Sequence, residues 1–394
     1  MEKEWVHVKT VTGNVATNEQ YLKRQHINNE FWREVGKGNH ILLGAPRRAG
    51  KTSLMTDLVE NCPEDFACIY KDLENIPNKE AFYKQLFHLI LQCADRSKFQ
   101  DARDFISRCL RRYNIKEIST TGITIDSREI RYETELLNII PEFKDAKFHT
   151  VIFLDEFAEV IHKLKNAGLK QDALDILYTL RALRHDENFR HFTIVYAGSI
   201  SLETVIRQID RTKLINDLRP IRLKPLTDEE ATRLIAQLLK VATIRVPDEV
   251  QHYLKEKLEY LLPYYLQLII EAIDDIAFDS RNPMITTEIV DRAFERVLNE
   301  HKNFEDWVDR ISVYQEDHFP FINEILVQAA HEGGITVREI YEKAIVHGLT
   351  QSYMDFVYDL IQNGYLKEAE KHVYIFASPL LQQFWLKKYP IYHV

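Results

Sequence analysis

The 394-residue chain contains few residues that constrain the fold covalently or interrupt regular structure: four cysteines, 12 glycines and 12 prolines. The cysteines show neither the C-x-x-C pairing nor the spacing toward histidines that zinc sites require. We therefore expect no structural zinc, and we expect reduced thiols, as in a cytoplasmic protein. The four cysteines are Cys62, Cys68, Cys93 and Cys109.

The sequence also lacks long apolar runs and an excess of positive charge. No stretch of about 18 apolar residues occurs, and the start of the chain shows no basic segment followed by an apolar one, so we expect neither membrane insertion nor export. The net charge of −9 argues against a protein that coats a polyanion, which leaves only local nucleic-acid contacts. The 45% apolar content is enough for two or three domains of roughly 100 to 200 residues.

One segment has the composition of a loop that binds phosphate groups. It follows an apolar run at His40–Leu43 that is typical of a buried strand, and it precedes a helical pattern over Thr52–Glu60. A loop in this position directs backbone N–H groups and the positive end of the helix dipole at one point, which suits a triphosphate. The predicted nucleotide-binding residues are Ala45, Pro46, Arg47, Arg48, Ala49, Gly50, Lys51, Thr52 and Ser53.

Three residues of this loop have predicted roles. Gly50 leaves room for close backbone approach, Lys51 bridges the β- and γ-phosphates, and the Thr52 hydroxyl joins the coordination shell of Mg²⁺. The segment departs from G-x-x-x-x-G-K-[ST] at Ala45, which stands in place of the first glycine, while Gly44 lies one residue earlier. The alternative is a chance occurrence of glycine, lysine and threonine in a turn.

A second apolar run, over residues 148–154, is followed directly by Asp155 and Glu156. In phosphoryl-transfer sites an acid at the end of a strand holds the metal ion, and a neighbouring acid can polarise the attacking water. We therefore assign Asp155 to Mg²⁺ and Glu156 to the water, with Asp155, Glu156 and Lys51 as the catalytic residues. The alternative is that the acidic pair caps a helix that begins near Ala158.

A third apolar run, over residues 191–198, is followed by Ser199. Ligands of open α/β sheets bind at the carboxyl ends of the strands, so Ser199, or with less support Ser201, is a candidate sensor of the γ-phosphate. The alternative, a serine that begins a turn, fits the sequence about as well.

These elements resemble the archaeal-type ATPase family of the STAND group of AAA-like P-loop NTPases, in which the pattern over Pro46–Leu54 is typical. Further similar segments are 21–24, 69–74, 221–230 and 263–268. Two departures stand out. Leu261 and Leu262 stand where the family has a glycine and a polar residue, just before the segment 263–268. The arginine that would reach the γ-phosphate in the family has only loose substitutes here, Arg211 and Arg219. The resemblance implies a P-loop sheet flanked by helices, followed by a helical lid and a winged-helix domain, with ATP and Mg²⁺ as cofactors.

The pattern along the chain predicts three parts. Residues 1–225 form the ATPase core, with a mostly helical insertion at 94–147, and residues 226–302 form the lid, whose first helix begins with a capping signal at Thr227. Residues 303–394 contain three helical patterns, an alternating hairpin pattern over 364–376 and a last helix at 379–388, which together indicate a winged helix.

Charge argues against DNA binding by the predicted winged helix. Residues 318–394 contain six Lys or Arg against eight Asp or Glu, and the helix expected to enter the groove, at 350–362, contains Asp355 and Asp359 but no Lys or Arg. Phosphate contacts supply much of the affinity of such complexes. In the predicted core, Arg103, Arg108, Arg111 and Arg112 are more typical of a solvated helix face than of a nucleic-acid site.

The sequence therefore predicts a cytoplasmic ATPase switch, slow without a partner, that contacts a protein partner or a second copy of itself. Two alternatives remain open. One is an ATP-dependent DNA-binding regulator or loader that uses the winged helix, and the other is a nucleotide-binding scaffold that does not hydrolyse.

Overall fold

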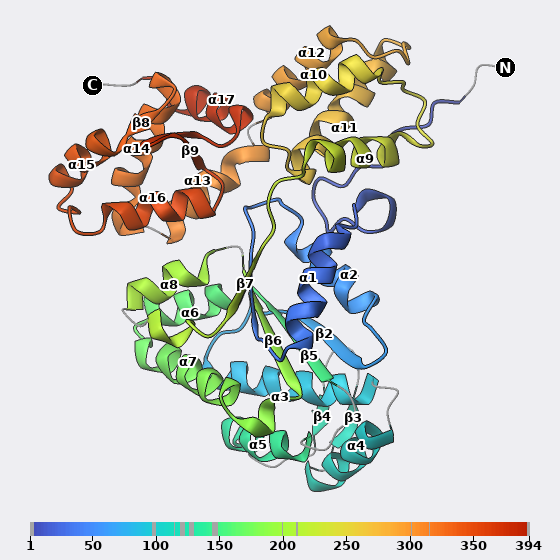
Figure 1. Ribbon diagram of the computed structural model, residues 1–394, viewed down its shortest axis with the longest axis vertical. Coiled ribbons are helices and arrows are strands. Elements are labelled where there is room, and N and C mark those ends of the chain that lie inside the picture. Colours follow the sequence, from blue (N-terminus) through green and yellow to red (C-terminus); the bar gives the residue numbers. More distant parts are fainter. Residues whose placement is uncertain are drawn as a thin grey trace. The chain divides into compact units, whose positions relative to one another are not determined.

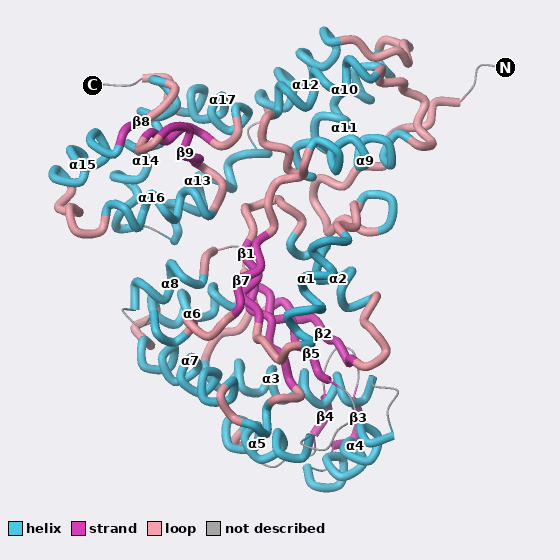
Figure 2. The backbone as a smooth tube through the Cα atoms, viewed as in Figure 1, coloured by secondary structure: helices cyan, strands magenta, loops and turns pink. Residues whose placement is uncertain are grey.

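The computed structural model divides into two compact units (Figures 1 and 2). The sheet unit comprises Lys23–Gly44 and Leu54–Leu223, and the C-terminal unit comprises Met1–Leu22, Ala45–Ser53 and Lys224–Val394. The residues that the structure describes are 4–96, 100–113, 115–118, 123–125, 130–143, 149–198, 200–209, 212–300, 302–314 and 316–391. The predicted domain bounds at residues 225 and 302 stay a prediction.

A parallel five-stranded sheet forms the centre of the sheet unit. Its strand order is β2-β5-β6-β1-β7. Strand β5, which lies between β2 and β6, is almost entirely buried, with residues 151–154 at 0% exposure, as expected of a parallel sheet covered on both faces. The strands are β1 (Ile41–Gly44), β2 (Phe66–Asp72), β5 (His149–Asp155), β6 (Phe192–Ala197) and β7 (Arg219–Arg222).

Helices cover both faces of this sheet. The connection from β1 to β2 crosses the sheet in the opposite direction from the later connections, so right-handed crossovers place α2 on the other face. Figure 1 shows α1 and α2 on one side, with α6, α7 and α8 on the other. Phe31 of α1 stacks on Phe153 with ring centroids 5.5 Å apart, and Phe157 of α6 meets Tyr196 at 5.0 Å. The helices are α1 (Gln25–Gly36), α2 (Lys51–Glu60), α3 (Lys79–Arg96), α6 (Phe157–Asn166), α7 (Lys170–Arg184) and α8 (Leu202–Ile209), with 3₁₀ turns η3 (Glu187–Phe189) and η4 (Thr212–Leu214).

The described residues between β2 and β5 are mostly helical. They also include two short strands, β3 and β4, that pair as an antiparallel hairpin. Arg108, Arg111 and Arg112 are exposed, which agrees with a solvated face, whereas the side chain of Arg103 lies outside the described residues. The elements are α4 (Gln100–Tyr113), β3 (Ile115–Ile118), β4 (Ile123–Ile125), α5 (Tyr132–Ile139) and η2 (Ile140–Phe143).

The expectation of four reduced thiols is wrong for Cys62 and Cys68, which form a disulfide. Cys62 follows the end of α2 and Cys68 lies in β2, and the turn between them brings their Cα atoms to 6.3 Å, within the range that a disulfide requires. Cys93 and Cys109 are buried and form no disulfide. Spacing alone did not reveal the pair, because it depends on how the turn folds.

The C-terminal unit begins its helical part with four helices, α9 (Asp228–Leu239), α10 (Asp248–Leu258), α11 (Pro263–Asp279) and α12 (Thr287–Asn299). The predicted capping signal is confirmed as a capping box: Thr227 Oγ1 accepts from the Glu230 backbone N–H at 3.2 Å, and the Glu230 carboxylate accepts from the Thr227 N–H at 3.0 Å. A 3₁₀ turn, η1 (Asn18–Gln20), contacts α9.

The remaining elements match the predicted helices and hairpin closely. Strands β8, β10 and β9 form an antiparallel sheet in that order, and α14, α15, α16 and α17 accompany it. The name winged helix remains an interpretation of this pattern. The elements are α13 (Lys302–Tyr314), η5 (Glu316–His318), α14 (Phe319–Glu332), β8 (Ile335–Thr336), α15 (Val337–Val346), α16 (Tyr353–Gln362), β9 (Leu366–Glu370), β10 (Val373–Phe376) and α17 (Pro379–Lys388).

Buried aromatic side chains join α13 to the end of the chain. The Tyr365 hydroxyl donates to the Trp307 carbonyl at 2.7 Å, and Phe304 stacks on Phe384 with centroids 5.3 Å apart. Tyr365 is only 2% exposed and belongs to this core. These contacts pack α13 against the elements that follow it.

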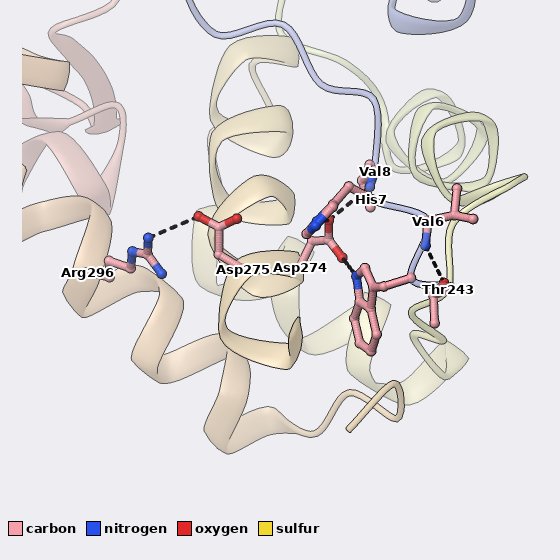
Figure 3. A network of polar contacts seen from close by, with 8 residues as sticks. Val6, His7, Val8, Thr243, Asp274, Asp275 and Arg296 are labelled. Carbon is pink, nitrogen blue, oxygen red and sulfur yellow. Dashed lines mark hydrogen bonds and ion pairs between the residues drawn. The ribbon is translucent and has the colours of Figure 1, made fainter. Parts of the chain in front are cut away.

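The N-terminal segment is tied to α11 through the buried Asp274 (Figure 3). Trp5 Nε1 donates to Asp274 Oδ1 at 3.1 Å, the Val8 backbone N–H donates to Oδ2 at 2.9 Å, and His7 Nδ1 lies 2.8 Å from the same oxygen. Thr243 exchanges two hydrogen bonds with the Val6 backbone. The segment therefore belongs to this unit although it precedes the sheet unit in sequence. Among the described helices, none is long and apolar enough to cross a bilayer.

Candidate functional site

The carboxyl ends of the parallel strands define one edge of the sheet. Gly44 ends β1, Asp72 ends β2 and Asp155 ends β5, with Asp72 and Asp155 in register. Strand β6, which leads toward Ser199, lies between β5 and β1. The acidic pair and the phosphate loop therefore both follow strands that end at this edge.

Asp155 is held rigidly at the end of β5. It is 3% exposed, Tyr70 Oη donates to its Oδ2 at 3.2 Å, and the Glu156 backbone N–H donates to its Oδ1 at 3.0 Å. Its own carbonyl accepts from the Leu73 N–H at 3.0 Å, which links it to the end of β2. The carboxylate is thus oriented by groups from two strands.

Tyr70 is a candidate site residue that sequence reasoning missed. Burial, together with the charges of Asp155 and Asp72, holds the pKa of its phenol above the ordinary range, so the hydroxyl stays protonated and donates. A tyrosine inside an apolar strand carries no sequence signal for this role. Only the register of β2 against β5 places its hydroxyl beside the acid.

Glu156 occupies a left-handed backbone conformation, with φ 54° and ψ 25°, at the start of α6. A non-glycine residue in this region costs roughly 1 to 3 kcal/mol and is found mainly at functional sites. Its side chain makes no capping hydrogen bond to α6, so the alternative in which the acidic pair caps the helix is wrong for Glu156. Glu156 is the N-cap residue of α6 by position, and its backbone carbonyl accepts from the Glu159 N–H at 3.1 Å.

The predicted strand, loop and helix around the phosphate loop are confirmed as β1, residues 45–50 and α2. The loop contains two residues with positive φ, Arg48 at 65° and Gly50 at 89°. Gly50 adopts this conformation without strain, whereas Arg48 does so at a cost. The Ala49 N–H donates to the Pro46 carbonyl at 3.2 Å and closes a turn within the loop.

The side chains of Arg47 and Arg48 contact α13 within the C-terminal unit, a contact that the sequence did not predict. Both guanidiniums pair with Asp306 of α13, and Arg48 Nη2 lies 3.1 Å from Asp306 Oδ2. The Arg48 guanidinium also lies over the ring of Tyr264 in α11, 4.4 Å from its centroid. Tyr264 lies in the segment 263–268, one of those whose sequence resembles the archaeal-type ATPase family.

The predicted site residues fall into three groups. Residues 45–53 belong to the C-terminal unit, Asp155 and Glu156 belong to the sheet unit, and Ser199 lies outside the described residues, as does Arg211. Ser201 accepts from the Thr204 N–H at 3.4 Å at the start of α8, which favours the turn interpretation for this serine. Arg219 Nε lies 3.5 Å from the carboxylate of Glu34.

The donor set of the predicted Mg²⁺ site consists of one hydroxyl, Thr52, and one carboxylate, Asp155. Among the described residues no group of three or more His, Cys, Asp and Glu side chains could hold a metal ion by itself. Mg²⁺ is usually bound through one or two carboxylates together with substrate phosphates and waters. A hydroxyl and a carboxylate are oxygen donors of the kind that suits Mg²⁺ bound together with a nucleotide.

Comparison with protein families and with curated protein sequences finds no match. Among solved structures, a Walker-type ATPase of Pyrococcus abyssi matches with a TM-score of 0.63 and 15% identity, over 93% of this chain and 97% of that one. The ORC2 protein of Aeropyrum pernix, in ADPNP and ADP complexes, matches with a TM-score of 0.46 and 12% identity over 95% and 98%. The ORC1 protein of the same organism, in complex with DNA, matches with 0.43 and 12% over 93% and 93%.

The similarity to the Pyrococcus protein establishes the fold class. The central parallel sheet flanked by helices, with a mostly helical C-terminal part, is that of a P-loop NTPase.

Proposed function

We propose that this protein binds and hydrolyses ATP with Mg²⁺ and acts as a switch whose nucleotide state controls the position of the lid and the C-terminal elements. The observation that carries the proposal is the shared edge of the parallel sheet. Strand β1 leads from this edge into a phosphate loop and α2, and β5 ends there in a rigidly held acid followed by a second acid.

Each candidate residue has a role in this proposal. The backbone of residues 45–53 and the Lys51 ammonium bind the phosphates, while Thr52 and Asp155 would hold Mg²⁺. The ion would neutralise charge on the phosphates when bound. Glu156 accepts a proton from the attacking water, and Ser199 contacts the γ-phosphate. No arginine finger is assigned, so turnover is expected to be slow until a partner or a second copy supplies one.

The surface of α15 and α16 favours a protein partner over DNA. Tyr341, Ile345 and Val346 are exposed apolar side chains of α15, with Val346 at 81% exposure. Helix α16 presents the exposed Asp355 and no Lys or Arg, and its second acid, Asp359, is buried. Apolar exposure beside negative charge suits a protein surface and opposes a phosphate backbone.

Phosphate release from ATP with Mg²⁺ tests the proposal. Glu156→Gln should lower the rate by a factor of about 100 or more while nucleotide binding persists, because the amide cannot accept the proton. Glu187→Gln, an exposed acid of the same unit, is the matched control and should leave the rate unchanged. Equal rates in wild type and Glu156→Gln would contradict the assignment.

The same assay separates the alternatives. A wild-type rate that rises with protein concentration would support completion of the site by self-association. Stimulation by duplex DNA, together with DNA binding that weakens steeply with salt, would instead support a DNA-binding regulator or loader. Tight ATP binding with no turnover under any of these conditions would indicate a nucleotide-binding scaffold.

A further inference from the structure

Two arginines of the phosphate loop share a single carboxylate. Arg47 and Arg48 both contact Asp306 Oδ2, at a sequence separation of more than 250 residues. Their side chains are 19% and 30% exposed, and that of Asp306 is 46% exposed. The three side chains are therefore partly shielded from water. A charge-assisted contact is stronger in such a place than at an open surface.

One carboxylate cannot accept hydrogen bonds from all the N–H groups of two guanidiniums. The Nε atoms of Arg47 and Arg48 are buried and have no hydrogen-bond partner within the described part of the chain. Two positive charges facing one negative charge also leave a net positive charge at the contact. Convergent, planar guanidinium donors are the groups that suit phosphate oxygens best.

Several contacts fix the loop in this arrangement. Tyr264 stacks on the Arg48 guanidinium, and Pro46 packs against Gly364, which precedes β9. A Cβ atom added at Gly364 would lie 3.0 Å from Pro46 Cβ and 2.9 Å from Tyr260 Oη, so only glycine allows this approach. The strained backbone of Arg48, at φ 65°, is held within these contacts.

We propose that the guanidiniums of Arg47 and Arg48 form a side-chain subsite for the phosphate chain of the nucleotide, and that Asp306 occupies this subsite as an internal anion. The inference rests on the proposed binding of nucleotide by residues 45–53. Nucleotide phosphates and Asp306 compete for the same two arginines, so ATP binding weakens the hold of the loop on α13. Because α13 packs against the final elements through Trp307 and Phe304, the contact connects the nucleotide to the C-terminal part.

Equilibrium binding of Mg-ATP to the full-length protein tests this competition. Asp306→Asn removes the competing charge and should tighten ATP binding by roughly 5- to 20-fold, the usual range for coupled sites. Asp309→Asn is the matched control, since it removes the same charge from an exposed position of the same helix and should leave the affinity unchanged. In an Arg47→Gln/Arg48→Gln background, Asp306→Asn should have no effect, because no subsite remains.

A second readout does not depend on nucleotide binding. Hydrogen exchange of α13 in the nucleotide-free protein should be faster in Asp306→Asn than in Asp309→Asn. If wild type binds ATP in a Lys51-dependent manner but Asp306→Asn and Asp309→Asn bind it equally, the inference is overturned and the proposed function stands. If neither wild type nor Asp306→Asn binds ATP, the proposed function fails and the inference fails with it.

Discussion

The acidic strand end of the sheet unit and the phosphate loop of the C-terminal unit are stabilised in different ways. Asp155 is oriented by its neighbour in sequence, Glu156, and by Tyr70 on the adjacent strand. The loop arginines are instead held by Asp306 and Tyr264, which lie more than 200 residues later in the chain. Both elements include a non-glycine residue in the left-handed region, Glu156 and Arg48.

This difference indicates which part of the candidate site is fixed and which part can respond. A carboxylate set by strand register cannot move without disturbing the sheet. A loop whose side chains depend on separate helices can change partners when those helices move or when another anion arrives. We therefore expect changes at the acid to alter chemistry, and changes at the loop partners to alter affinity.

The largest expected effect comes from the loop itself. Lys51→Ala should weaken Mg-ATP binding by roughly 100-fold or more, because it removes charge-assisted hydrogen bonds to the phosphates. Lys240→Ala, an exposed lysine of the same unit, is the control and should bind as wild type does. Titration with a fluorescent ATP analogue measures both. If Lys51→Ala binds Mg-ATP as tightly as wild type, the loop does not bind the phosphates and the comparison with the acidic strand end fails.

The second expected effect concerns the stability of the sheet unit, which should depend on pH through the buried His40. His40 precedes β1, is 8% exposed, stacks on Phe189 and accepts at Nδ1 from the Ile194 N–H at 3.0 Å. Burial is the main cause that lowers the pKa of His40 to about 3. In the unfolded chain the histidine pKa lies near 6.5, so between pH ~3 and pH ~6.5 the unfolded chain binds more protons at His40 than the folded chain does. The contribution of His40 to the free energy of unfolding is therefore fully present above pH ~6.5 and is lost as the pH drops below it.

At pH 5 the shifted pKa of His40 should lower the free energy of unfolding by about 2 kcal/mol relative to its value at high pH. Urea unfolding at pH 7.5 and pH 5.0 should show wild type losing more stability on acidification than His40→Asn, whose amide oxygen can accept the same hydrogen bond. His252→Asn, at an exposed histidine of α10, is the control. The assignment is contradicted if His40→Asn has the same pH dependence as wild type.

The smallest expected effect concerns Tyr70, which tests how the acid is oriented. Tyr70→Phe removes the donor to Asp155 but keeps the ring, so the Mg²⁺ concentration that half-saturates ATP hydrolysis should rise about 3- to 10-fold. Tyr178→Phe, an exposed tyrosine of α7, should leave this concentration unchanged. An identical Mg²⁺ dependence in Tyr70→Phe and wild type would show that strand register alone orients the acid.

Sequence patterns located the strands, the loop and most helices because each depends on local properties. The apolar runs before Gly44 and Asp155 became buried parallel strands, and the capping signal at Thr227 became a capping box. Hairpin alternation after Gly364 gave β9 and β10. The cysteine prediction was wrong for Cys62 and Cys68 because pairing depends on the geometry of a turn, which composition does not encode.

The sequence by itself determined that a glycine-containing loop follows one buried strand and that two acids follow another, because residue type and short-range periodicity specify strand ends, helix starts and turn glycines. Only the tertiary structure decided that Tyr70 donates to Asp155, and that Arg47 and Arg48 share Asp306. These contacts depend on strand register and on the packing of helices distant in sequence. No local pattern records them, because their free energy arises only when the chain has brought both partners together.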